Sequence, residues 1–168
     1  LYIGDMEIGL IDGSGNIQEL RVPADPLDPD TKMIGYELGK AFLVSSYDLF
    51  GNISCLTDPH TQEVVEGYSY SAYGKETIYD FEGYVIEQSE WKNPWRYQGK
   101  RKDSETGLIY FGHRYYDPEL GRFISPDPIH PQGSWDSPYQ FCNGNPHFYR
   151  DTLGLEAEAR DSEKFKNY

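Results

Sequence analysis

The sequence predicts an all-β protein of short antiparallel hairpins with little helix. Aromatic residues make up 15% of the 168 residues, although hydrophobic residues reach only 38%. Gly and Pro together account for 28 residues, one in six. Aromatic rings pack on pleated surfaces and Gly supplies the positive φ of tight turns, so this composition favours strands and turns. The only good helix former is 155–166, and its lack of an apolar stripe makes that helix marginal.

A degenerate repeat predicts the hairpins of the first half. Segments 11–20, 47–56 and 71–80 each place a Gly shortly after an Asp, Tyr or Ser. An Asp side chain can cap such a turn, the Gly takes the left-handed conformation, and a strand follows. Segment 64–75 alternates Tyr with Ser or Ala, the period of two that is typical of a strand. Segment 21–33, rich in Pro and acidic residues, predicts a loop.

The second half opens with a predicted hairpin of its own. Segments 93–101 and 107–117 flank the turn KDSETG, and a further turn at 116–121 leads into a strand over 122–125.

The excess of acidic side chains ends before this hairpin. Residues 1–90 carry 4 basic and 17 acidic side chains, whereas 91–168 carry 11 of each, which places a boundary near 89–92.

The net charge of −13 excludes some classes of partner. A general nucleic-acid binder needs clustered Lys and Arg against phosphate, and anionic membrane surfaces are disfavoured for the same reason. The longest aliphatic and aromatic run is residues 41–44, too short to span a bilayer. No signal peptide is visible, and the chain begins with Leu1, which suggests a fragment of something longer.

Three motifs in the second half are specific enough to indicate a family. They are TGLIYFGHRYYDPELGRFISPDP (106–128), GNP (144–146) and DTLGL (151–155). Together they closely resemble the RHS repeat-associated core domain, which closes the YD-repeat shells of bacterial Rhs polymorphic toxins and of insecticidal Tc toxin C components. The upstream YDLFGNI and YSYSAYG elements look like YD repeats.

The resemblance implies an architecture. Residues 1–90 would be degenerate YD/RHS-repeat strands that form hairpins of a β-shell. Residues 91–155 would be the RHS core, an inward-turning plug that closes the shell, and 156–168 would begin a variable C-terminal segment. Only 13 residues follow Leu155, too few for a folded toxin domain, so either the toxin lies beyond the end of this chain or this copy is truncated.

The resemblance also implies intramolecular aspartyl autoproteolysis. Asp127 and Asp151 match the catalytic positions of the family pattern, and Gly154 is retained as a supporting residue. The bond broken would be Leu155–Glu156. The pattern has Gly where His130 stands and Pro where Thr152 stands, and the separation of 24 residues between the two Asp is two longer than the pattern's.

Two adjacent carboxyl groups suit this chemistry because they cannot both ionise and therefore share a proton. One withdraws a proton from water while the other polarises the carbonyl. The alternative is structural: Asp127 is a turn residue before Pro128, and Asp151 caps the following turn. Arg122, five residues before Asp127, could stabilise a carboxylate or hold the cleaved segment, or it could be a surface Arg.

Other polar residues leave further alternatives open. His113 and His130 could titrate near neutral pH, or could be packed and hydrogen-bonded. Asp136 is a reserve carboxylate. Cys55 and Cys142 lack metal-ligand spacing, and two buried free thiols are favoured over the one disulfide that they could form. No metal or cofactor is expected.

The sequence therefore favours the shell-and-plug segment of an exported or cell-surface bacterial toxin scaffold that releases a C-terminal effector. Its expected partners are the rest of its own shell, the toxin segment and an immunity protein. Two alternatives remain: a structural remnant that no longer cuts, given His130 and Thr152, and a YD-repeat module that binds carbohydrate or a cell surface.

Overall fold

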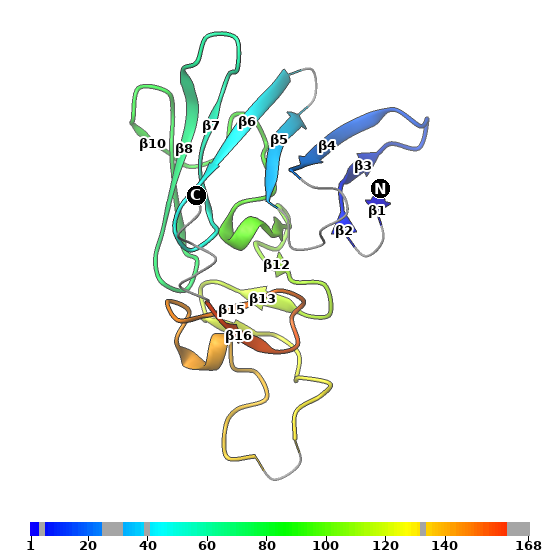
Figure 1. Cartoon of the computed structure of the whole chain (residues 1–168), viewed down its shortest axis with the longest axis vertical. Coiled ribbons are helices and arrows are strands. Elements are labelled where there is room, and N and C mark those ends of the chain that lie inside the picture. The colour runs from blue at the N-terminus through cyan, green and yellow to red at the C-terminus, as the bar shows by residue number, and fades with distance from the viewer. Residues whose placement is uncertain (4–5, 25–31, 39–40, 132–133, 161–168) are drawn as a thin grey trace. The chain divides into compact units, whose positions relative to one another are not determined.

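The computed structural model describes residues 1–3, 6–24, 32–38, 41–131 and 134–160 (Figure 1). Within these ranges the chain is nearly all β, in antiparallel sheets, so the predicted fold class is confirmed. The only helical elements there are two short 3-10 turns, η1 (Tyr97–Gly99) and η2 (Cys142–Gly144). No helix in the described part of the chain is long and apolar enough to cross a membrane.

The chain divides into two compact units. The first comprises 1–48, 52–69 and 77–93. The second comprises 49–51, 70–76 and the chain from Pro94 onward. The second unit therefore includes two turns contributed by the acidic half of the sequence.

An eight-stranded antiparallel sheet accounts for most of the first unit, and its spatial order follows the chain from β3 to β10. Its strands are β3 (Gly9–Ile11), β4 (Ile17–Pro23), β5 (Met33–Leu38), β6 (Ala41–Tyr47), β7 (Ile53–Thr57), β8 (Val64–Tyr70), β9 (Glu76–Tyr79) and β10 (Val85–Ile86). A separate small pair precedes them, β1 (Tyr2–Ile3) with β2 (Met6–Glu7). Such a meander follows from short strands joined by tight turns.

The predicted Asp-capped turns are confirmed. Asp48 Oδ1 accepts the N–H of Asn52 at 2.9 Å, and Gly51 takes a φ of +79°. Asp12 Oδ1 accepts the N–H of Asn16 in the same way. A further turn of this kind, capped by Asp80, closes β9–β10 and was missed in the sequence.

The predicted loop over 21–33 was wrong at both ends. Residues 21–23 finish β4, and Met33 begins β5. Strand pairing overrides the local turn signal there, because β4 and β5 hydrogen-bond across Arg21–Tyr36 and Val22–Gly35. Residues 25–31, the middle of this prediction, lie outside the described residues.

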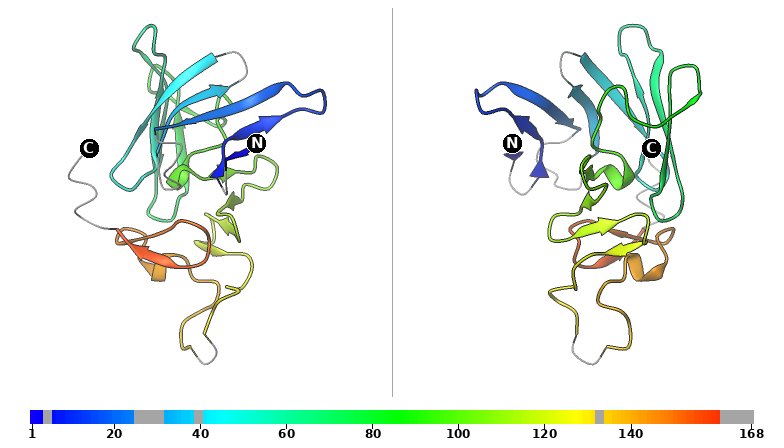
Figure 2. Two further views of the ribbon diagram at one scale, coloured as in Figure 1. Left: turned by 45° about the vertical axis from the view of Figure 1, so that its right-hand side comes forward. Right: turned by 180° about the vertical axis from the view of Figure 1, so that it is seen from behind.

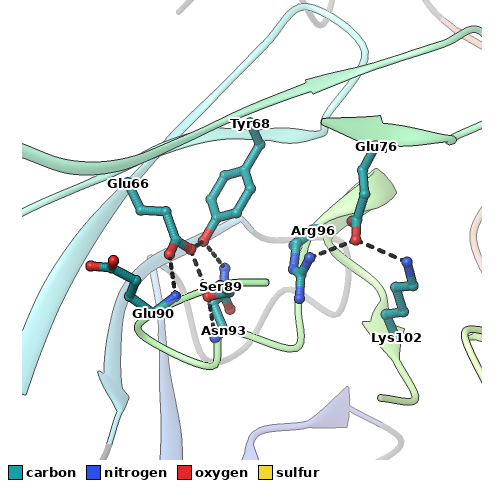
Figure 3. A network of polar contacts seen from close by, with 8 residues as sticks. All are labelled: Glu66, Tyr68, Glu76, Ser89, Glu90, Asn93, Arg96 and Lys102. Carbon is teal, nitrogen blue, oxygen red and sulfur yellow. Dashed lines mark hydrogen bonds and ion pairs between the residues drawn. The ribbon is translucent and has the colours of Figure 1, made fainter. Parts of the chain in front are cut away.

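A buried carboxylate fastens the end of the first unit to its sheet (Figure 3). Glu66 on β8 is fully buried and accepts hydrogen bonds from the hydroxyl of Tyr68, from Ser89 Oγ at 2.6 Å and from the N–H of Glu90 at 2.8 Å. Asn93 extends the network, since its N–H donates to Ser89 Oγ and its side-chain amide to the Tyr68 hydroxyl. The segment after β10 is thereby held against β8.

Replacing Glu66 by Ala is expected to lower the free energy of unfolding by roughly 3 kcal/mol, because each donor left unsatisfied in a buried place costs about 1–3 kcal/mol. Glu66→Gln keeps one acceptor oxygen and should lose less. Urea unfolding measures the change, with the exposed Glu63→Ala as control. An Ala variant as stable as the wild type would contradict the expectation.

The second unit contains a four-stranded meander and a hairpin. The meander is β11 (Arg101–Lys102), β12 (Ile109–Tyr110), β13 (Tyr115–Asp117) and β14 (Arg122–Phe123), which confirms the predicted turns within 102–107 and 116–121. The hairpin pairs β15 (Tyr149–Asp151) with β16 (Ala157–Ala159). In both views of Figure 2 the yellow-green meander and the orange-red hairpin lie side by side.

The marginal helix predicted over 155–166 is wrong where it can be judged. Residues 157–159 form β16, because pairing with β15 satisfies their backbone groups, whereas an isolated helix without an apolar stripe has no surface to bury. Residues 161–166 lie outside the described part.

An aromatic cluster forms the core of the second unit. Its fully or nearly fully buried members are Tyr97, Ile109, Phe111, Tyr116, Phe123, Phe141 and Cys142. The Tyr116 and Phe141 ring centroids are 4.2 Å apart. Edge-to-face contacts join Phe111 to Phe123 and to Phe141. This cluster supports the polar site described next, because the guanidinium of Arg114 lies 3.7 Å from the centroid of the Phe123 ring.

Candidate active site

Each of the two predicted aspartates holds a turn with one carboxyl oxygen. Asp127 follows β14, and its Oδ1 accepts the N–H of Ile129 at 3.0 Å. Asp151 ends β15, and its Oδ1 accepts the N–H groups of Gly154 and Leu155 at 2.5 and 3.1 Å. The structural roles weighed in the sequence are therefore present. They leave the second oxygen of each carboxyl group available for another partner.

Arg114 joins these two second oxygens. Its Nη2 lies 3.1 Å from Asp127 Oδ2 and 3.6 Å from Asp151 Oδ2. Arg114 and Asp151 are only 3% and 2% exposed, and a buried cation needs such partners. Among the described residues no hydrogen bond joins the two carboxyl groups directly. The structure thus differs from the proton-sharing pair expected from sequence, because the guanidinium lies between the two aspartates.

Sequence reasoning chose Arg122 and missed Arg114. Arg122 is exposed on β14, and in the described part of the chain it forms no ion pair with either aspartate. Arg114 stands between Phe111 and Tyr115 in a run of aromatic residues. A charged residue within such a run is expected to be buried and paired, and that signal could have identified it.

The loop before the predicted scissile bond is held at every carbonyl. The carbonyl oxygens of residues 152–155 accept four successive hydrogen bonds: Lys100 Nζ to Thr152 at 2.5 Å, His113 N to Leu153 at 3.0 Å, Arg114 Nε to Gly154 at 2.5 Å and Arg114 Nη2 to Leu155 at 3.3 Å. The carbonyl of the Leu155–Glu156 bond therefore touches the same nitrogen that binds both aspartates.

Gly154 is required by this arrangement. Its φ is +74°, and a Cβ there would lie 3.1 Å from Phe111 Cβ and 3.2 Å from the backbone nitrogen of Arg114. A side chain at this position would be strained and would push the loop away from the arginine.

The chain after the scissile bond is anchored as well. Asp151 pairs with Ala157 across the hairpin, and Arg150 pairs with Glu158. Arg160 Nε donates to the carbonyl oxygens of Tyr149 at 3.1 Å and Pro146 at 3.2 Å. The Leu155–Glu156 bond therefore lies between two fastened segments, with Glu156 itself exposed.

A cavity of about 50 Å³ lies beside Leu155 and Ala157, on either side of Glu156 in the chain. Its lining includes Asp127, Asp151, Arg114, Leu155, Asp136 and His130. A polar space of this size holds a few water molecules. His130 is half-buried at the cavity. His113, by contrast, is exposed and acts through its backbone N–H.

Burial sets the protonation of two groups at the site. It raises the pKa of Asp151 above its ordinary value of 3.8, although the N–H groups of Gly154 and Leu155 and the cations Arg114 and Lys100 oppose this. It also raises the pKa of the Cys142 thiol to about 12. Cys142 therefore stays a thiol and is a poor nucleophile.

Both cysteines are free thiols, the favoured alternative, but Cys55 is half-buried whereas Cys142 is buried. The His147 ring packs edge-on against Phe50 at 5.2 Å. Among the described residues no group of three or more His, Cys, Asp or Glu side chains is arranged to hold a metal ion.

The chain is similar to known toxins over part of its length. No protein-family model matches it. It is 37% identical over 103 residues to the tRNA nuclease WapA of Bacillus subtilis (strain 168), which covers 60% of this chain and 4% of WapA. It is 37% identical over 76 residues to the toxin protein Tse5 of Pseudomonas aeruginosa, which covers 45% of this chain and 6% of Tse5.

Solved structures show the same likeness. The crystal structure of TcdB2-TccC3-Cdc42 matches 70% of this chain and 5% of its own at 28% identity, with a TM-score of 0.55. A crystal structure of TcdB2-TccC3 matches 86% of this chain and 7% of its own at 23% identity and a TM-score of 0.61, which shows a common fold. The chain thus spans less than a tenth of these relatives.

Fold and relatives define the class: this is a β-rich segment similar to parts of toxin-associated scaffold proteins. Within that class, the relatives support an RHS repeat-associated core domain similar to that of the Tc toxin C components.

Proposed function

We propose that this segment belongs to a shell that encloses a C-terminal effector, and that it cuts its own chain between Leu155 and Glu156. The observation that carries the proposal is the position of Arg114, whose Nη2 contacts Asp127, Asp151 and the carbonyl oxygen of Leu155. The rest of the shell and the effector are the partners this implies, with an immunity protein for the effector and export from a bacterium.

The first step is the addition of water to the Leu155 carbonyl carbon. Asp127, the more exposed of the two aspartates, takes a proton from a water molecule in the cavity. The water oxygen bonds to the carbon, and the carbonyl π electrons move to the oxygen. Arg114 stabilises the negative charge that develops there.

The second step breaks the bond between the Leu155 carbon and the Glu156 nitrogen. Asp151 in its protonated form donates to the departing nitrogen, and the carbonyl re-forms. The products are a carboxyl group on Leu155 and an amine on Glu156, and the proton held by Asp127 restores the acid. Because the bond is already held at the site, no substrate has to be bound from solution.

The rate of cleavage is expected to fall as pH rises through the raised pKa of Asp151, because ionised Asp151 has no proton to donate. The descending limb of the pH profile therefore lies above pH 3.8. The folded state also holds this proton more tightly than the unfolded chain, so ionising Asp151 lowers the free energy of unfolding in the same window. Intact mass at a series of pH values measures the rate. A rate that increases through this window would contradict the assigned role.

The decisive test is the intact mass, under denaturing conditions, of this chain extended by a tag beyond residue 168. The wild type should break at Leu155–Glu156, while Asp127→Asn and Asp151→Asn should stay whole and remain folded by circular dichroism. Asp136→Asn is the matched control, because Asp136 lines the cavity and, among the described residues, forms no ion pair with Arg114. A folded wild type that stays intact would overturn self-cleavage and leave a structural plug.

A further inference from the structure

Lys100 contacts the scissile loop at its first carbonyl. It caps η1, and its ammonium donates to the oxygen of Thr152 at 2.5 Å. Thr152 follows Asp151 directly, so this bond holds the loop immediately beside the buried carboxyl group. The other three carbonyls are held by residues 113 and 114, from a different part of the unit.

The side chain of Lys100 is itself supported. It is half-buried, and its ammonium lies 5.7 Å from the centroid of the Phe111 ring, a member of the aromatic core. Phe111 also lies close to Gly154, since a Cβ there would be 3.1 Å from Phe111 Cβ. Lys100 thus connects the rigid core to the loop, as an aromatic-supported cation does when partly desolvated.

We propose that Lys100 is a positioning residue for self-cleavage, which clamps the carbonyl of Thr152 and so keeps the Leu155 carbonyl on Arg114. This inference rests on the proposed self-cleavage. Thr152 does not fix its own φ, whereas a proline would, because its ring closes on the backbone nitrogen. The clamp therefore supplies a restraint that the loop residue itself does not.

Lys100 also acts on the charge of the site. The charged and titratable groups around Asp151 are Arg114 and Lys100, with Cys142 beside it and Asp127 beyond the guanidinium. The Lys100 cation opposes the burial that raises the pKa of Asp151. Removing this cation should raise that pKa further, and the descending limb of the cleavage profile should move to higher pH. A merely structural lysine would not move it.

Three substitutions separate the hydrogen bond from the charge. Lys100→Met removes both, and cleavage should slow by about 10- to 100-fold, the scale on which small misplacements act. Its pH profile should also shift upward. Lys100→Gln keeps an N–H donor without the charge, so the profile should shift with a smaller loss of rate. Lys100→Arg keeps both the N–H donor and the positive charge and should cleave like the wild type. Lys75→Met is the control, since the Lys75 ammonium is exposed and forms its ion pair with the exposed Glu119.

A Lys100→Met variant that cleaves at the wild-type rate over the whole pH range would overturn the proposal. So would a slowed variant with an unshifted profile, because it would show only a loss of structure. If the wild type itself does not cleave, the proposed function fails, and the positioning role is judged separately.

Amide hydrogen exchange gives that separate judgement. It is measured in the Asp127→Asn background, where the chain is expected to stay whole, at the N–H groups of Gly154 and Leu155. Both donate to Asp151, so they report how firmly the loop is held. Adding Lys100→Met should speed their exchange, whereas Lys75→Met should not. Unchanged exchange would overturn the clamp whether or not the chain cleaves.

Discussion

Arg114→Met is expected to slow self-cleavage by at least about 100-fold, the usual cost of removing a donor that stabilises an oxyanion. The same change leaves Asp151 buried without its cation. It should therefore also lower the free energy of unfolding by about 3–5 kcal/mol, as happens when one partner of a buried ion pair is removed. Arg114→Lys keeps the positive charge, but an ammonium lacks the planar fork that contacts Gly154, Leu155 and both carboxylates. It should therefore restore the free energy of unfolding more than the rate of cleavage.

The measurement is intact mass over time beside urea unfolding of the same samples. Arg122→Met is the matched control, since Arg122 is exposed on β14 and should change neither quantity much. The assignment fails if Arg122→Met stops cleavage and Arg114→Met does not. Comparing the Lys and Met variants then shows whether lost cleavage follows from lost chemistry or from lost structure.

Phe141→Ala is expected to lower the free energy of unfolding of the second unit by about 3–5 kcal/mol. The Phe141 ring is 1% exposed and contacts the rings of Tyr97, Phe111, Tyr116 and Phe123. Removing it leaves a cavity at the centre of the aromatic cluster, directly before Cys142 at the active site. Cleavage should be lost together with the fold.

Trp95, nearly fully buried in the second unit, provides a fluorescence probe for this unfolding. Phe148→Ala is the control, because that ring is 69% exposed and its loss should matter by only about 0.5 kcal/mol. Equal stability of the Phe141 and Phe148 variants would show that the cluster is not the core of this unit.

Local chemistry made the turns predictable. Asp12 and Asp48 each bond to backbone groups two to four residues away, so composition and short spacing contain all the information required. The hairpin around Gly107 is predictable for the same reason. Asp127 and Asp151 were found through a motif, and their turn-forming oxygens also act locally.

Long-range packing decided the rest. The helix predicted for the tail becomes β16 because a partner strand is available at β15. Glu66, which has the pattern of a solvated strand residue, is fully buried because Ser89 and Glu90 return to it. Neither outcome has a local signature, since the groups that satisfy the backbone or the carboxylate come from elsewhere in the fold.

The active site shows most clearly which features follow from local sequence and which follow from long-range packing. Sequence alone determined an all-β chain, its capped turns and two aspartates 24 residues apart. Only the tertiary structure selected Arg114 over Arg122, because Arg122 is exposed on β14, whereas the bend between β12 and β13 brings Arg114 to Asp127 and Asp151. A buried guanidinium pairs with the carboxylates that the fold places near it in space, and these residues can be far away along the chain.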